Sequence, residues 1–186
     1  MNRLFVSIPV LAALALPAAA QADTTGTDKT NAAKECRTER GSTPATREAF
    51  KARYGTNANK SNAFGKCVSK RSKSEEAQRE SAASNAAKDC KAERSADPAA
   101  FKAKYGTNKN GNNAYGKCVS QKAKAKKEAA DQADAKAIAA RKSAAKTCAT
   151  ERKADADAFK AKYGTNRNKS NAFGKCVSAT AKKNKS

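Results

Sequence analysis

The 186-residue sequence contains no histidine and no tryptophan. Histidine is the most common general base in enzymes and a common metal ligand, so its absence argues against most hydrolytic and metal-dependent chemistry. After the first 22 residues, no apolar run approaches the roughly 18 residues that a membrane-spanning helix needs. We therefore expect a protein without enzymatic activity, cofactor, bound metal or small-molecule substrate, and without a transmembrane segment in the mature chain.

The N-terminus has the pattern of a secretory signal peptide over residues 1–22. Arg3 supplies a positive charge, residues 4–16 are apolar, and Ala20-Gln21-Ala22 fits a small-residue cleavage site. Cleavage after Ala20 and cleavage after Ala22 both fit the pattern. It predicts a protein that is secreted or resides in the periplasm or cell envelope.

A cysteine-containing segment occurs three times, beginning AAKECRTER at Ala32, AAKDCKAER at Ala86 and AAKTCATER at Ala144. Each copy ends with a close variant of KYGTNxNKxNAFGKCVS, whereas the stretches between copies are rich in Lys, Ala and Glu and barely alike. The repeat therefore predicts three modules on tethers. The predicted segments are a flexible N-terminal segment (23–32), module 1 (33–69), a linker (70–86), module 2 (87–120), a second linker (121–144), module 3 (145–178) and a basic tail (179–186).

Six cysteines in an exported chain are expected to form disulfides. Pairing across the first linker, between Cys67 and Cys90, is disfavoured if that linker is helical. About 23 residues of helix would hold these cysteines roughly 34 Å apart, whereas a disulfide needs its Cα atoms within about 7 Å. Each copy has two cysteines, and the predicted pairing is the one that keeps every module self-contained: Cys36–Cys67, Cys90–Cys118 and Cys148–Cys176.

Each module is predicted to contain three short helices. Phe50 and Tyr54, spaced i,i+4, define the buried stripe of the second helix in module 1. We expect Gly55 to end that helix with a positive φ and Asn62 to cap the third helix. The break before the second helix is three residues longer in module 1, which indicates a tolerant surface loop. The equivalent residues in modules 2 and 3 are Gly106, Gly164, Asn113 and Asn171.

The linkers contain no proline or glycine and consist mainly of good helix formers, so we expect them to be helical. They lack an apolar stripe, which predicts solvated struts rather than members of a bundle. The expected fold class is all-α, with three small disulfide-stapled helical modules in tandem, joined by Ala/Lys/Glu-rich helical linkers.

Two further features recur in every module. One glutamate is kept, at Glu39, Glu93 and Glu151, and a single carboxylate does not make the acidic pair of a glycosidase. We expect these glutamates to pair with lysine or arginine. The glycines of YGTN and FGK match no phosphate-binding loop and indicate helix ends and close packing.

The formal charge is +22, of which the predicted signal peptide holds only Arg3. Five cationic positions recur in all three modules. Surface lysines kept only for solubility would occupy different positions in different copies. The recurring positions favour a non-enzymatic protein that binds an anionic polymer multivalently, such as wall polymer, an anionic lipid surface or nucleic acid. The alternative is a structural spacer of the cell envelope whose charge only keeps it soluble. The candidate residues are Lys34, Lys88 and Lys146; Arg40, Arg94 and Arg152; Lys51, Lys102 and Lys160; Arg53, Lys104 and Lys162; and Lys66, Lys117 and Lys175.

The shared sequence pattern AAKxCxxER…FxxKYGTNxNKxNAFGKCVS resembles that of a group of uncharacterised exported repeat proteins from actinobacteria and their relatives. All three modules match it, and module 2 departs at Gly111, Asn112 and Tyr115. The resemblance implies an exported bacterial protein and implies nothing about activity. Neither the identity of the polymer nor the oligomeric state is predicted.

Overall fold

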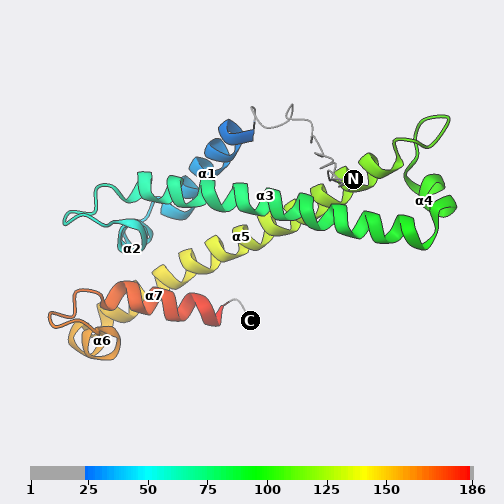
Figure 1. The fold of residues 1–186 in the computed structure, drawn as a ribbon. Helices are drawn as coiled ribbons and strands as arrows, with labels where there is room; N and C mark the ends of the chain where they lie inside the picture. Colours follow the sequence, from blue (N-terminus) through cyan, green and yellow to red (C-terminus); the bar gives the residue numbers. More distant parts are fainter. Residues whose placement is uncertain (1–23, 185–186) are drawn as a thin grey trace, which may run out of the picture.

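The computed structural model describes residues 24–184, which form seven α-helices and no β-strand (Figure 1). The predicted signal peptide and its cleavage site lie outside these residues. Within the described range, no helix is long and apolar enough to cross a lipid bilayer. The helices are α1 (Thr24–Arg40), α2 (Pro44–Tyr54), α3 (Ala63–Ala96), α4 (Pro98–Tyr105), α5 (Ala114–Ala154), α6 (Ala156–Tyr163) and α7 (Ala172–Lys183).

The three predicted disulfides are all confirmed. Each joins the first helix of a module to its third helix, so that the bonds link α1 to α3, α3 to α5 and α5 to α7. The Cα–Cα distances are 6.0, 6.0 and 6.1 Å, within the usual range for a disulfide. With its helical linkers, the structure has the predicted all-α fold class.

Both linkers are parts of long continuous helices, as their composition predicts. The 34-residue α3 runs from module 1 into module 2, and the 41-residue α5 runs from module 2 into module 3. The prediction that these linkers are solvated is wrong, because α3 and α5 pack against each other (Figure 1). Ala82 of α3 and Ala137 and Ile138 of α5 are buried, and the buried Glu75 pairs with Lys127 at 2.5 Å. Alanine side chains let helices approach closely, and the ion pair neutralises the charge that is buried between them.

The segment predicted to be flexible, residues 23–32, is also largely helical. α1 begins at Thr24 and packs along α3. Ala32 is fully buried, and the carboxylate of Asp28 accepts a hydrogen bond from Arg79 of α3 at 3.3 Å. The neighbouring helix thus orders a stretch that is polar in sequence.

Modules 1 and 3 lie together at one end of the molecule, and module 2 lies at the other end (Figure 1). α2 of module 1 contacts α5 and α7, and its Ala45 and Ala49 pack against the module 3 core around Phe173 and Val177. α4 of module 2 contacts α3 and α5. The picture of independent modules on tethers is therefore wrong for modules 1 and 3.

The three extra residues of module 1 do not form a loop. α2 has 11 residues, whereas α4 and α6 have 8 each, so the insertion lengthens the helix by about one turn. Thr43 caps the longer helix through a hydrogen bond to the Thr46 amide at 3.3 Å. Ala45, in the added turn, reaches the module 3 core.

The three modules share one internal arrangement. The rings of Phe50 and Tyr54 lie 4.9 Å apart, and the equivalent pairs in modules 2 and 3 have the same separation. The tyrosine hydroxyl donates to the recurring glutamate in each module, at 2.9 Å for Glu39 and 3.0 Å for Glu93 and Glu151. Each glutamate also binds a lysine or arginine, so the predicted pairing is confirmed.

Gly55, Gly106 and Gly164 end their helices without a positive φ, contrary to prediction. Their φ angles are −72°, −72° and −75°, and the need for glycine is instead steric. A Cβ at these positions would lie 2.5 to 2.7 Å from the carbonyl oxygen four residues earlier. The positive φ angles of this loop occur five residues later, at Lys60 (56°), Gly111 (64°) and Lys169 (56°).

The asparagines predicted to cap the third helices hold the loop instead. Asn62 is at the N-cap position of α3, but its side chain makes no capping hydrogen bond. Its Oδ1 accepts from the Thr56 amide at 3.1 Å, and its Nδ2 donates to the Thr56 hydroxyl at 2.7 Å. Asn113 and Asn171 repeat this arrangement.

Two glycines of module 2 should respond in opposite ways to substitution by alanine. In Gly106→Ala, the new methyl would meet the Lys102 carbonyl oxygen at 2.5 Å and the Gly111 Cα at 2.8 Å. We expect this to lower the free energy of unfolding by about 1 to 3 kcal/mol. In Gly116→Ala the methyl meets nothing within 4 Å, so stability should be unchanged or rise by up to about 1 kcal/mol. Urea denaturation of both oxidised variants measures the difference, and equal stabilities would contradict the steric role of Gly106.

Candidate functional site

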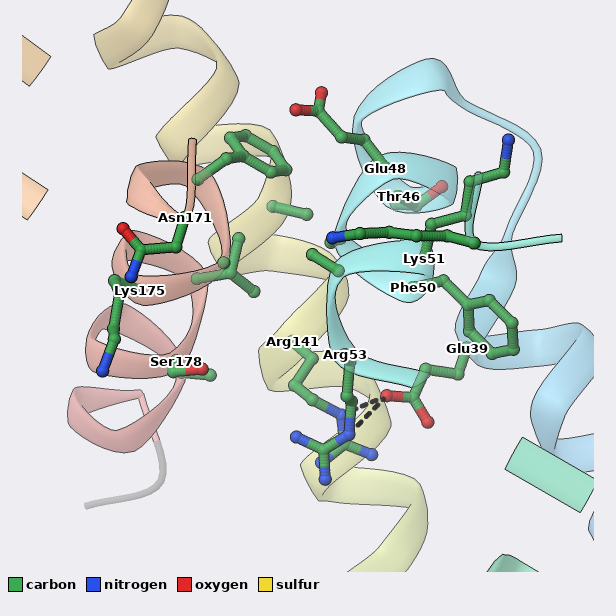
Figure 2. Close-up of a pocket in the computed structure, with 18 of the residues that line it drawn as sticks. Glu39, Thr46, Glu48, Phe50, Lys51, Arg53, Arg141, Asn171, Lys175 and Ser178 are labelled. Atoms are coloured by element: carbon green, nitrogen blue, oxygen red, sulfur yellow. Dashed lines mark hydrogen bonds and ion pairs between the residues drawn. The ribbon is translucent and has the colours of Figure 1, made fainter. Parts of the chain in front are cut away.

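A cleft of about 780 Å³ lies between α2, α5 and α7 (Figure 2). α2 of module 1 forms one wall and α7 of module 3 the opposite wall, with α5 behind them. The cleft exists because modules 1 and 3 pack together, and neither module would form it alone.

The walls of the cleft meet along small and apolar side chains. A Cβ placed on Gly174 of α7 would lie 3.4 Å from the Cβ of Ala52, so the two helices approach closely at this point. Val177 and Ala181 continue the apolar side of α7 and are about 95 % buried. The cleft therefore combines an apolar base with a polar rim.

Both carboxylates that line the cleft are already neutralised. Glu39 is 4 % exposed and accepts from Arg71 at 2.8 Å and from Arg141 at 2.5 Å. Burial alone would raise the pKa of Glu39, but hydrogen bonds and charge from Arg141 and Arg71 hold it below its ordinary value. Glu48 makes two hydrogen bonds with Arg152, at 2.6 and 2.8 Å.

The lysines that line the cleft have no such partners. None of them forms an ion pair with any residue in the described range 24–184, and four of the five are exposed. Their positive charges are thus left for a ligand. These lysines are Lys51 and Lys60 of module 1, Lys142 of α5, and Lys175 and Lys182 of α7.

Of the five recurring cationic positions, two make contacts inside their own module. Arg40, Arg94 and Arg152 lie over an aromatic ring of the third helix, at 5.6, 5.0 and 4.4 Å from its centre. The position of Arg53, Lys104 and Lys162 pairs with the recurring glutamate, at 3.5, 2.7 and 2.7 Å.

The other three recurring positions form no ion pair within the described part of the chain, with one exception. Lys160 lies 3.4 Å from Asp157, and the remaining eight lysines form no ion pair with a described residue. The structure brings only Lys51 and Lys175 of this set to the cleft. These positions are Lys34, Lys88 and Lys146; Lys51, Lys102 and Lys160; and Lys66, Lys117 and Lys175.

Three cleft lysines were missed by the comparison of copies. Lys142 belongs to a linker and Lys182 to the tail, so neither has an equivalent in every module. Lys60 does not recur in every module because module 2 has Gly111 at this position, and the positive φ of this position explains that glycine. The spacing of Lys175 and Lys182 by seven residues, on one face of a helix, is a signal that was present in the sequence.

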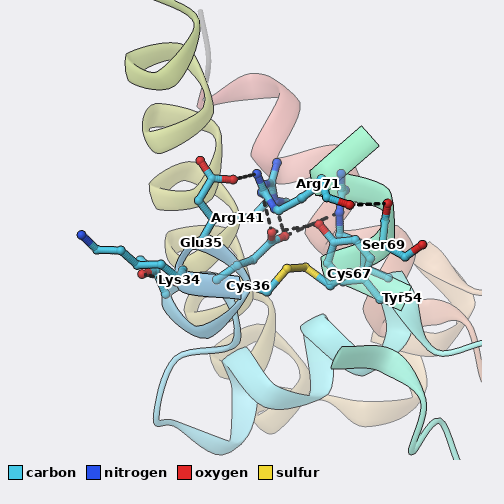
Figure 3. Close-up of a disulfide and its surroundings, with 12 residues drawn as sticks. Lys34, Glu35, Cys36, Tyr54, Cys67, Ser69, Arg71 and Arg141 are labelled. Atoms are coloured by element: carbon cyan, nitrogen blue, oxygen red, sulfur yellow. Dashed lines mark hydrogen bonds and ion pairs between the residues drawn. A yellow bond between two sulfur atoms is a disulfide. The ribbon is translucent and has the colours of Figure 1, made fainter. Parts of the chain in front are cut away.

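Glu35 and Arg71 lie near the Cys36–Cys67 disulfide (Figure 3), and Glu35 belongs to a second polar cluster. The carboxylates of Glu35, Glu75 and Asp134 have oxygens within 4.8 Å of one another. Burial, together with the charges of Glu75 and Asp134, raises the pKa of Glu35 despite its contact with Arg71. Each carboxylate has a partner, in Arg71, Lys127 and Gln78 respectively. The cluster is part of the packing of α1, α3 and α5.

Comparison of the chain with models of protein families, with curated proteins and with solved structures found no match. Residues 24–184 form an all-α, disulfide-linked structure with a cleft lined by five lysines. The function of the protein has to be inferred from that cleft and the charges around it.

Proposed function

We propose that this is a non-enzymatic exported or cell-envelope protein that binds anionic polymers, and that the cleft between α2 and α7 is the main binding site. One observation carries the proposal: the carboxylates in the cleft form ion pairs, whereas its five lysines form none with residues 24–184. Three disulfides fit an oxidising compartment outside the cytoplasm. Membership of the exported actinobacterial-type repeat proteins is part of the same proposal.

A polymer fits this charge distribution better than a small anion does. The unpaired lysines are spread from the cleft to module 2, at the far end of α3 and α5. The 34 residues of α3 span roughly 50 Å, so one ligand can touch both ends only if it is long. Several weak contacts on one polymer also reinforce each other through effective concentration.

The binding test compares lysines of the cleft with lysines of module 2 and of the linker that follows it. The first variant is K51Q/K142Q/K175Q/K182Q and the control is K102Q/K109Q/K117Q/K136Q. Lys102 and Lys117 occupy the same repeat positions as Lys51 and Lys175, but no second module covers them. The probes are long-chain polyphosphate, polygalacturonate, duplex DNA and vesicles with an anionic lipid, each titrated over a range of salt concentrations.

We expect the cleft variant to lose more affinity for the preferred probe than the control variant loses. For a phosphate polymer, losing four contacts should also reduce the slope of log K against log salt by about 3. Equal losses in the two variants would mean that only the total charge matters. No affinity for any probe at low salt would favour the alternative, in which the long crossed helices are a structural spacer.

A further inference from the structure

The contact between modules 1 and 3 is made by two small surfaces. On module 3, Arg152, Phe173, Gly174 and Val177 form what we call the docking face. On α2 of module 1, Glu48, Ala49 and Ala52 form what we call the alanine face. The alanines lie against the docking face, and Glu48 binds Arg152 with both carboxylate oxygens.

The docking face is repeated in modules 1 and 2, where no other helix in the range 24–184 covers its glycine. A Cβ on Gly65 or on Gly116 would meet no atom within 4 Å, in contrast to Gly174. Arg40 and Arg94 lie over their aromatic rings but form no ion pair with a described residue, in contrast to Arg152. The two uncovered faces are Arg40, Phe64, Gly65 and Val68 in module 1, and Arg94, Tyr115, Gly116 and Val119 in module 2.

The apolar residues of these faces are correspondingly less buried. Phe173 and Val177 are 5 % and 6 % exposed, whereas Phe64, Val68, Tyr115 and Val119 are only half-buried. Glycine in the first turn of a helix is also a poor choice, because almost any other residue favours the helix more. Only the covered copy gives the glycine a structural reason, namely the close approach of another helix.

An unoccupied alanine face is present on module 3. Asp157, Ala158 and Ala161 of α6 stand at the same places relative to Phe159 as Glu48, Ala49 and Ala52 do relative to Phe50. All three are exposed, and the Asp157 side chain is 95 % exposed despite its contact with Lys160. α4 of module 2 has Ala99 in place of the acidic residue, so it lacks a partner for the arginine.

We propose that the partner of these free faces is a second copy of this chain. The alanine face of α6 in one molecule docks on the free docking face of module 1 or module 2 in another, with Asp157 binding Arg40 or Arg94. Contacts between two different surfaces form a closed ring only where the rotation between subunits closes, and otherwise association through module 2 extends end to end. α6 and module 2 lie at opposite ends of the molecule, as this arrangement requires (Figure 1). α6 lacks the added turn with Ala45, so each contact is weaker than the one between modules 1 and 3.

The test is sedimentation equilibrium of the oxidised exported protein in roughly 0.5 M salt, which screens the repulsion between cationic chains. We expect the average mass to rise above that of the monomer over a roughly hundredfold range of protein concentration. The variant G65Q/G116Q should remain monomeric with unchanged or higher thermal stability, because both side chains point into open space. G26Q is the matched control, since Gly26 is also exposed in a helix with nothing within 4 Å, and it should associate as the wild type does.

A charge exchange separates docking from non-specific association. D157R alone and R40E/R94E alone should each associate less than the wild type, and an equimolar mixture of the two variants should recover association. A wild-type protein that stays monomeric up to the highest concentration would overturn the proposal. So would association that G65Q/G116Q leaves unchanged, or a mixture that shows no recovery.

Discussion

Glu39→Gln is expected to lower the free energy of unfolding at pH 7 by about 3 to 5 kcal/mol, the usual cost of removing one partner from a buried ion pair. Glu39 is 4 % exposed and neutralises Arg71 and Arg141, which come from two different long helices. Arg71 is itself buried, and its Nε has no hydrogen-bond partner among the described residues. The isosteric change creates no cavity, so the loss measures the charge that ties α1 to α3 and α5.

The repeat supplies the matched controls for this variant. Glu93→Gln and Glu151→Gln alter the same repeat position, where solvent reaches the ion pair with Lys104 or Lys162 and screens it. We expect both to be much milder than Glu39→Gln in urea denaturation. Three equal losses would contradict the idea that the long-range contacts of Glu39 hold the helices together.

The effect of Glu39→Gln should also depend on pH. A carboxyl whose pKa is lowered by folding stabilises the folded state above its unfolded pKa of about 4.3, and this contribution disappears as the pH falls through the folded pKa. Wild type and variant should therefore converge in strongly acidic solution. The raised pKa of Glu35 acts in the opposite sense, but it is present in both proteins and cancels from their difference to first order.

Removal of the Cys90–Cys118 disulfide should unfold module 2 and leave the other end of the molecule folded. The chain-entropy estimate for C90A/C118A is a loss of about 3 to 4 kcal/mol, for a sequence separation of 28 residues. The core of module 2 has five buried residues, two of which are the cysteines, and among the described residues its cluster includes none from another module. So small a core depends on its disulfide.

Module 3 provides the comparison, because its disulfide spans the same 28 residues. Its core is larger and is supported by Ala45 and Ala49 of α2. In hydrogen exchange, C90A/C118A should lose protection mainly in α4 and the adjoining ends of α3 and α5. C148A/C176A should retain protection in α7 against α2. Uniform loss of protection in both variants would mean that the molecule unfolds as one unit.

The parts of this fold that were predicted correctly follow from local sequence. Two cysteines per copy determine the disulfides, and runs without proline or glycine determine the continuous helices α3 and α5. The packing of those helices was missed because it depends on alanines such as Ala82 and on a buried ion pair between Glu75 and Lys127, which leave no hydrophobic periodicity. The partner of Glu39 was beyond prediction for a similar reason, since Arg141 lies 102 residues away.

The cleft was missed for a different reason. Comparing the three copies identifies the residues that every module shares. It identified Lys51 and Lys175 as candidates, but it could not show that modules 1 and 3 meet. A site between two modules also depends on residues that are not repeated in every module. Lys142, Lys182 and the added turn of α2 are all peculiar features, and the interpretation of that turn as a surface loop hid its contact with module 3.

The longer α2 has a consequence for how a tandem repeat acquires a defined shape. Copies of one module begin with identical surfaces, so an array of them has no preferred way to fold back. Three added residues give α2 of module 1 a further contact with module 3 through Ala45, which the shorter α4 and α6 lack, and this difference favours the pairing of modules 1 and 3. A change in the length of one helix thus helps to distinguish members of a duplicated set, and it contributes to a molecule with two unlike ends.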